Sequence, residues 1–188
     1  MTTDVPERIR RTVAAARLLH YGHLNGGALQ PVRFRDPRRV CGRVKPEGEG
    51  IIWCSPEGSE FGWREWCLSE MSSWLDLPLW QIDLAPSARV YLIDSLADLG
   101  ALVEQFHNRV MDTDAARYCR APISWPRVAE HYDAVHLTEK GQWKTRLSEP
   151  YNLYGWDCES VVILNTDAVA AVTLRALAQH LDGVLPPL

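Results

Sequence analysis

The stretch Asn152–Leu164, "NLYGWDCESVVIL", decides the expected fold because it leads from aromatic residues through a turn into an apolar strand. Its last four residues form a continuous apolar run, which is typical of a strand buried on both faces. Two carboxylates, Asp157 and Glu159, flank Cys158 directly before this run. A charge at the mouth of a buried strand is unfavourable unless it is paired or used. We therefore take Glu159 as a candidate catalytic carboxylate.

The elements around this strand predict an α+β fold, with a mainly antiparallel, split sheet and packed helices. Short apolar runs predict strands at "GIIWCSP", "LWQIDL", "ARVYLID" and "AVHLT". Helical spacing predicts helices over 7–19, in "FGWREWCLSEMSSWL", in "SLADLGALVEQFH" with Ser95 as N-cap, in "SWPRVAEHY" with Ser124 as N-cap, and in "TDAVAAVTLRALAQHLDG" with Thr166 as N-cap. Because these elements do not alternate as βαβ units, antiparallel pairing is favoured over a doubly wound parallel sheet.

The chain of 188 residues suits one domain, 1–188, with one sizeable core. Its accessory parts are the amino-terminal helix 7–19 and a basic loop over 30–49. The loop, within "QPVRFRDPRRVCGRVKPEGEG", is rich in Arg, Pro and Gly. We expect a long exposed segment with at most one short strand, since loops of this length in a compact domain are usually functional.

Composition indicates a globular protein of the cytoplasm. No apolar run approaches the roughly 20 residues that span a bilayer, and the start "MTTDVPERIRR" has no apolar signal-peptide core. Five widely spaced cysteines favour reduced thiols. The pairs His20/His23 and His131/His136 have neither an H-E-x-x-H frame nor a third ligand at a recognisable spacing, so we expect no metal.

The charge distribution and the aromatic content are compatible with a bound nucleotide or nucleic acid, but they also have structural explanations. The chain carries −4 overall, but residues 1–45 hold ten Lys/Arg and three Asp/Glu, which gives +7 and leaves −11 for the remainder. A basic first third can bind the phosphates of a cofactor or a nucleic acid; the alternative is a solvated helix face and loop. The eight tryptophans can form a stacking platform for bases or fill the core.

Three short motifs follow one another along the chain: "LLHYG" with His20, "GIIWCSPEGSEFGWREWC" with Ser55, and "GWDCESVVILNTDAV" with Glu159. Their order resembles that of the ADP-ribosyltransferase superfamily over roughly residues 18–170. The resemblance implies an ADP-ribosyltransferase-like fold and NAD as the substrate. It also implies transfer of ADP-ribose to a protein or nucleic acid, as in toxins and phage or bacterial effectors. The catalytic residues would be Glu159, His20 and Ser55.

The resemblance also implies which residues bind each substrate. The residues expected to bind NAD are His20, Tyr21, Gly22, Trp53, Ser55, Arg39, Tyr132 and Tyr154. Asp157 and Trp156 are expected to bind the acceptor. Many family members carry Gln-x-Glu or Glu-x-Glu in the third motif, and the shorter Asp157 stands here instead. The middle motif lacks the usual Tyr, so the aromatic over nicotinamide is Trp53 or one of the tyrosines 21, 132, 151 and 154.

The chemistry supports these residue types on physical grounds. Breaking the nicotinamide N-glycosidic bond develops a cationic ribose, which a fixed carboxylate stabilises only as it forms. Each residue also has a structural alternative: His20 as a cap of the first helix, Ser55 as a turn residue, Glu159 in a salt bridge with Arg, and Asp157 in an Asx-turn. Two other functions stay open, namely an RNA 2′-phosphotransferase-like enzyme of the same superfamily and a non-catalytic nucleic-acid- or protein-binding module.

Overall fold

The computed structural model describes residues 17–35, 45–108 and 122–177. Most of the expected helix 7–19 lies outside these residues, as do Arg39, two of the five cysteines (Cys41 and Cys119) and the end of the expected final helix.

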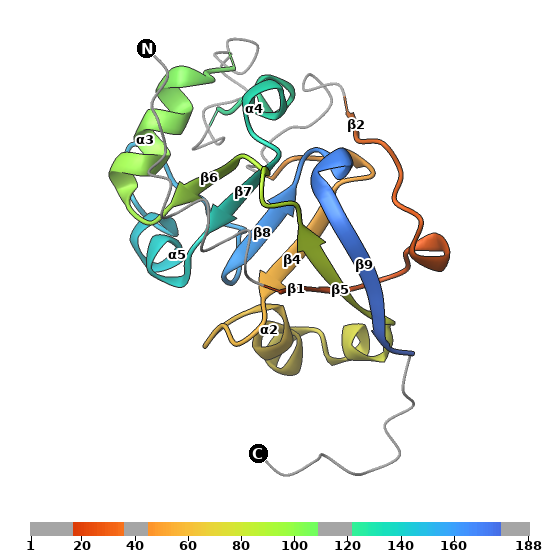
Figure 1. The fold of residues 1–188 in the computed structure, drawn as a ribbon. Helices are drawn as coiled ribbons and strands as arrows, with labels where there is room; N and C mark the ends of the chain where they lie inside the picture. Colours follow the sequence, from red (N-terminus) through yellow and green to blue (C-terminus); the bar gives the residue numbers. More distant parts are fainter. Residues whose placement is uncertain (1–16, 36–44, 109–121, 178–188) are drawn as a thin grey trace.

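One mixed sheet of seven strands forms the centre of the fold (Figure 1). Its order is β6-β7-β8-β4-β1-β5-β9. The strands are β1 Leu18–Tyr21, β4 Ile52–Pro56, β5 Leu79–Leu84, β6 Val90–Ile93, β7 Ala134–Leu137, β8 Ser160–Ile163 and β9 Val169–Ala176. Only the β6–β7 pair among these is parallel. The expected α+β class with a mainly antiparallel sheet is confirmed.

The helices lie around this sheet. They are α2 Trp63–Glu70, α3 Leu96–Gln105, α4 Trp125–His131 and α5 Glu139–Thr145, with 3-10 turns η1 Asn25–Gly27, η3 Ser72–Asp76 and η6 Thr166–Ala168. Ser95 caps α3 as expected, because its side chain accepts a hydrogen bond from the Asp98 backbone N–H. Ser124 stands at the N-cap position of α4. The basic loop contains two strands rather than one, β2 Arg33–Phe34 and β3 Gly48–Glu49, which pair with each other.

Two expected helices are strands. Leu18 and Leu19, the expected end of the first helix, begin β1, which lies between β4 and β5. The expected final helix is η6 followed by β9, which pairs along β5. Asn165 rather than Thr166 caps η6, since its side chain accepts from the Asp167 N–H. In both segments pairing with distant strands outweighs local helical spacing.

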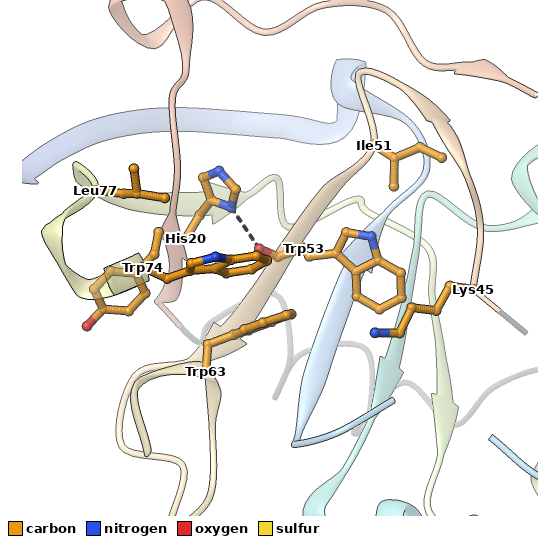
Figure 2. Close-up of a pocket in the computed structure, with 8 residues that line it drawn as sticks. His20, Lys45, Ile51, Trp53, Trp63, Trp74 and Leu77 are labelled. Carbon is orange, nitrogen blue, oxygen red and sulfur yellow. Dashed lines mark hydrogen bonds between the residues drawn. The ribbon is translucent and has the colours of Figure 1, made fainter. Parts of the chain in front are cut away.

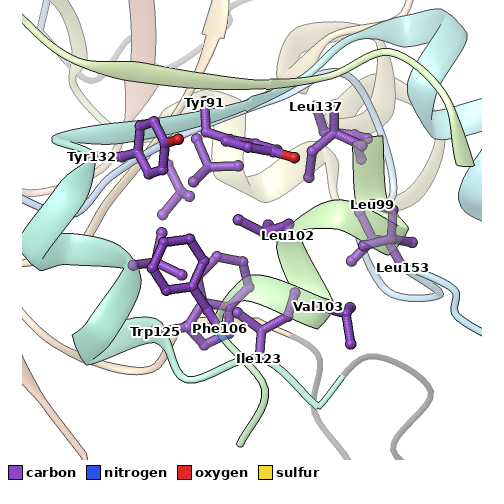
Figure 3. Close-up of a cluster of buried hydrophobic side chains, with 14 of the residues drawn as sticks. Tyr91, Leu99, Leu102, Val103, Phe106, Ile123, Trp125, Tyr132, Leu137 and Leu153 are labelled. Carbon is purple, nitrogen blue, oxygen red and sulfur yellow. The ribbon is translucent and has the colours of Figure 1, made fainter. Parts of the chain in front are cut away.

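The core has two clusters. One lies between the sheet and helices α3 and α4 and contains Leu99, Leu102, Phe106, Trp125 and Tyr132 (Figure 3). The other is built from β1, β4, β5 and β8 and contains Leu18, Ile52, Cys54, Ile82 and Val161. Both clusters contact residues of β4 and β8. Packing on both faces therefore fixes the backbone of these central strands, and several of the candidate site residues lie in or directly beside them.

Candidate functional site

The central strand β4 changes partner along its length. Its first three residues pair with β8, and its last two pair with β1. The ladder between β1 and β4 therefore stops at Leu19. The next residue, His20, spans the gap with its side chain, since its Nδ1 lies 2.8 Å from the Trp53 carbonyl oxygen (Figure 2). A carbonyl only accepts hydrogen bonds, so Nδ1 donates.

Two cavities adjoin at this opening. The first, of about 380 Å³, is lined by His20, Tyr21, Lys45, Ile51, Trp53, Trp63, Trp74 and Leu77. The second, of about 340 Å³, is lined by His20, Gly22, His23, Leu24, Ala28, Leu29, Gln30, Gly50, Ile51 and Ile52. Because both cavities are lined by His20 and Ile51, they are adjacent at these two residues.

Tryptophan rings form the walls of the first cavity. Trp63 and Trp74 stack with their planes 16° apart and their centroids 5.8 Å apart, while Trp53 lies on the other side (Figure 2). The Lys45 ammonium stands 5.5 Å from the centroid of the Trp53 ring, and its Nζ lies 3.3 Å from an Asp157 carboxylate oxygen. Flat aromatic walls with a cation at the edge suit a planar ring attached to a phosphate.

Gly22 leaves room for the His20 ring. A Cβ at position 22 would lie 2.5 Å from His20 Nε2, closer than nonbonded atoms allow. Burial lowers the pKa of His20 below its ordinary value, although the bond to the Trp53 carbonyl raises it. The ring is therefore neutral at neutral pH, with Nδ1 as donor and Nε2 as acceptor.

Ser55 ties Glu159 to β4 and α2. Its Oγ donates to the Glu159 carbonyl oxygen at 2.6 Å and accepts from the Trp63 backbone N–H at 2.8 Å. The Glu159 N–H in turn donates to the Phe61 carbonyl at 3.0 Å. The backbone of Glu159 is therefore fixed on both sides, and Ser55 is a structural link rather than a simple turn residue.

The Glu159 carboxylate binds a buried histidine. Its Oε1 lies 2.8 Å from Nε2 of His136, and the two side chains are only 14% and 10% exposed. Burial alone raises the pKa of Glu159. The opposing effects of His136, of the Ser59 hydroxyl and of the Glu139 backbone N–H outweigh it, so the pKa is lower than usual. Within the described residues, the partner of the Glu159 carboxylate is thus a histidine and not an arginine.

The structure brings part of the expected set together. His20, Tyr21 and Trp53 line the first cavity, and His20 and Gly22 line the second. Asp157 is linked to the first cavity by its ion pair with Lys45. Ser55 and Glu159 line neither of these two cavities but are bonded to each other beside them.

Three expected residues lie elsewhere. Tyr132 is buried in the core, edge-on to Tyr91 with ring centroids 5.1 Å apart. Trp156 is 1% exposed and packs behind Trp53 at 4.7 Å, so it supports the cavity wall and has no surface to offer an acceptor. Tyr154 is 63% exposed, carries the Arg146 guanidinium on its ring and lines neither cavity.

Sequence reasoning missed Lys45, Trp63, Trp74 and His136 as site residues. His136 had a signal, because it is the one polar residue in the apolar run "AVHL". Apart from the high number of tryptophans, no sequence signal marks Trp63 and Trp74 as site residues, because the sequence does not distinguish a tryptophan that lines a cavity from one in the core. Lys45 reaches the site only through the fold of the loop before β4.

The described residues contain no group of three or more His, Cys, Asp and Glu placed to hold a metal ion. Cys54, Cys67 and Cys158 are buried free thiols. Burial raises the pKa of each, that of Cys158 to about 12, so none is activated as a nucleophile. No helix within the described ranges has the length and apolar character to cross a membrane.

Comparison of the chain with known protein families, with curated protein sequences and with solved structures finds no match. The function is therefore argued from the site alone.

Proposed function

We propose that this protein is an NAD-dependent ADP-ribosyltransferase that moves ADP-ribose to a macromolecular acceptor. The observation that carries the proposal is the shared attachment of two distant residues, His20 and Glu159, to β4. His20 bonds to the Trp53 carbonyl, and Ser55 bonds to the Glu159 carbonyl. A single strand therefore fixes the separation between the His20 imidazole and the backbone of Glu159, as a site that must align a dinucleotide with its catalytic group requires.

The cavities suit the parts of NAD. The nicotinamide ring stacks in the tryptophan-walled cavity, where an aromatic contact contributes about 1–3 kcal/mol by analogy with base stacking. His20 Nε2 accepts a hydrogen bond from a ribose hydroxyl, and the far end of the dinucleotide enters the second cavity. Lys45 supplies positive charge for the phosphates. The acceptor approaches from the side of Glu159 and Asp157.

The reaction breaks the bond between ribose C1′ and the nicotinamide nitrogen. The bonding pair leaves with nicotinamide, which becomes neutral, and the ribose becomes an oxocarbenium ion. The acceptor then supplies the pair for the new bond to C1′ and loses its proton to solvent. Because the pKa of Glu159 is lowered, its carboxylate is ionised at neutral pH. It acts as a fixed negative charge that stabilises the cationic ribose.

Glu159→Gln tests this proposal. The amide has the size of the carboxylate and leaves the backbone bonds to Ser55 and Phe61 in place, but it removes the charge. We expect nicotinamide release from NAD to fall by at least about 10²-fold, while calorimetry shows NAD binding within a few-fold of the unchanged protein. Glu104→Gln, at an exposed position of α3, is the matched control and should leave both quantities unchanged.

Two outcomes would contradict the proposal in different ways. Salt-dependent nucleic-acid binding that is indifferent to Glu159→Gln, without NAD binding, indicates a non-catalytic binding module. Nicotinamide release that requires a 2′-phosphorylated RNA indicates a 2′-phosphotransferase at the same site.

A further inference from the structure

A buried histidine lies next to the candidate catalytic carboxylate. His136 stands in β7, paired with Leu92 of β6 and Val161 of β8, and is 8% exposed. Its Nε2 bonds to Glu159, whereas its Nδ1 is buried without a hydrogen-bond partner among the described residues. A half-satisfied imidazole in an apolar strand is unfavourable for stability, so its single bond points to a role at Glu159.

We propose that His136 is a positioning residue that holds the Glu159 carboxylate in the orientation needed at the NAD ribose. The inference rests on the proposed function.

The geometry explains why such a residue is needed. Ser55 and Phe61 fix the backbone of Glu159, but its side-chain torsions remain to be set. Of the other groups that lower the pKa of this carboxylate, Ser59 comes from the turn after β4 and Glu139 contributes through its backbone N–H at the start of α5. His136 comes from the middle strand of three, which is the most rigid of these supports. It occupies Oε1 of the carboxylate.

Because Nδ1 of His136 has no hydrogen-bond partner among the described residues, it is possible to assign which ring nitrogen carries the proton. A neutral ring with its proton on Nδ1 would bury an unpaired N–H and turn the Nε2 lone pair toward a carboxylate oxygen. The ring therefore carries a proton on Nε2 and donates to Glu159. The charge of Asp94 interacts with His136, and Asp94 is itself paired with Lys140.

Two amide substitutions separate positioning from packing. The amide of His136→Gln reaches about as far as Nε2 and can still donate to Glu159, whereas that of His136→Asn is too short. We expect His136→Asn to lower kcat for nicotinamide release by about 10²-fold, with KM for NAD nearly unchanged because His136 lines neither cavity. His136→Gln should retain most of kcat. Equal kcat in the two variants would overturn the inference.

A second readout does not depend on activity. Carbon-13 NMR titration of the Glu159 carboxyl should show a higher pKa in His136→Asn than in the unchanged protein, and a smaller increase in His136→Gln. His131→Asn, at an exposed position of α4, is the control and should leave this pKa unchanged. An unmoved Glu159 pKa in His136→Asn would overturn the inference. A moved pKa in a protein that releases no nicotinamide would overturn only the proposed function.

Discussion

At the scale of single residues, His20 shows how a side chain can replace a backbone contact. The sequence allowed it to be a helix cap or a ligand-binding residue, and the structure excludes the cap because Leu18–Tyr21 is a strand. Its bond to the Trp53 carbonyl stands where the β1–β4 ladder stops. The ring is thereby held with Nε2 free to accept, next to a glycine that leaves it space.

This arrangement predicts a pH dependence. The pKa of His20 is below its ordinary value of 6.5 in the folded protein, chiefly because of burial. The contribution of the neutral ring to stability is therefore complete above pH 6.5 and is lost as the pH falls from 6.5 toward the folded pKa. Protonation of Nε2 also removes the acceptor that we propose for a ribose hydroxyl.

We therefore expect NAD affinity to fall as the pH drops through the folded pKa of His20. Calorimetry at several pH values, with NMR titration of the imidazole, measures both quantities. In His20→Gln the affinity should be lower, and this acid dependence should be absent. An affinity that stays constant while the imidazole titrates would contradict the acceptor role.

At the scale of elements, the sequence predicted what local patterns encode. The strands β4 to β8 and helix α3 with its Ser95 cap carry clear period-2, apolar-run or capping signals. The segment of β9 is predicted as a helix because Val169, Val172 and Leu177 fit helical spacing after the expected cap Thr166. Its pairing with β5 is non-local and cannot be read from the segment itself.

Helix α5 was not predicted, although it has a start signal. The Thr138 side chain accepts from the Gly141 N–H, but Gly141 itself lowers helix propensity. The glycine is required by packing, since a Cβ there would lie 2.0 Å from the Ile93 carbonyl oxygen. Here close approach of a helix to a strand outweighs intrinsic propensity, and this contact is visible only in three dimensions.

The link between β4, α2 and β8 predicts an effect on stability. Ser55 is 4% exposed and bonds to Trp63 N–H and Glu159 C=O. Ser55→Ala leaves both backbone groups without this partner, which we expect to cost about 1–3 kcal/mol of unfolding free energy. Urea denaturation measures the loss. Ser69→Ala, on the exposed face of α2, should change stability by less than about 0.5 kcal/mol; an equal effect of the two substitutions would contradict the structural link.

At the scale of the whole molecule, the buried carboxylate of Asp133 connects segments next to three neighbouring strands, β6, β7 and β8. Asp133 accepts from the Arg89 backbone N–H and guanidinium and from the Asn165 amide, and its carbonyl accepts from two backbone N–H groups beyond β8. Three segments next to β6, β7 and β8 thus meet at one residue. No local pattern predicts this junction, because the partners are separated from Asp133 by more than 30 positions in each direction.

Removal of this carboxylate should weaken the fold. Burial raises the pKa of Asp133, but the bonds and charge of Arg89 and the Asn165 amide outweigh it, so the folded pKa is low. Its contribution to stability is therefore complete above the unfolded pKa of about 3.9 and is lost as the pH falls through the lower folded value.

We expect Asp133→Ala to lose about 2–3 kcal/mol of unfolding free energy at pH 7, measured in urea. The difference from the unchanged protein should shrink in strongly acidic buffer. Asp76→Ala, at an exposed carboxylate of η3, is the control. A difference that stays the same from pH 7 to strongly acidic buffer would show that the carboxylate charge has no part in the effect.

The change of partner along β4 has an evolutionary consequence. Leu19 meets β4 through main-chain atoms, which every amino acid possesses, so drift among apolar residues there preserves the register. One position later the connection depends on an imidazole. In relatives that keep the fold but do not bind the proposed ligand, we therefore expect position 19 to vary among apolar residues and position 20 to lose its histidine.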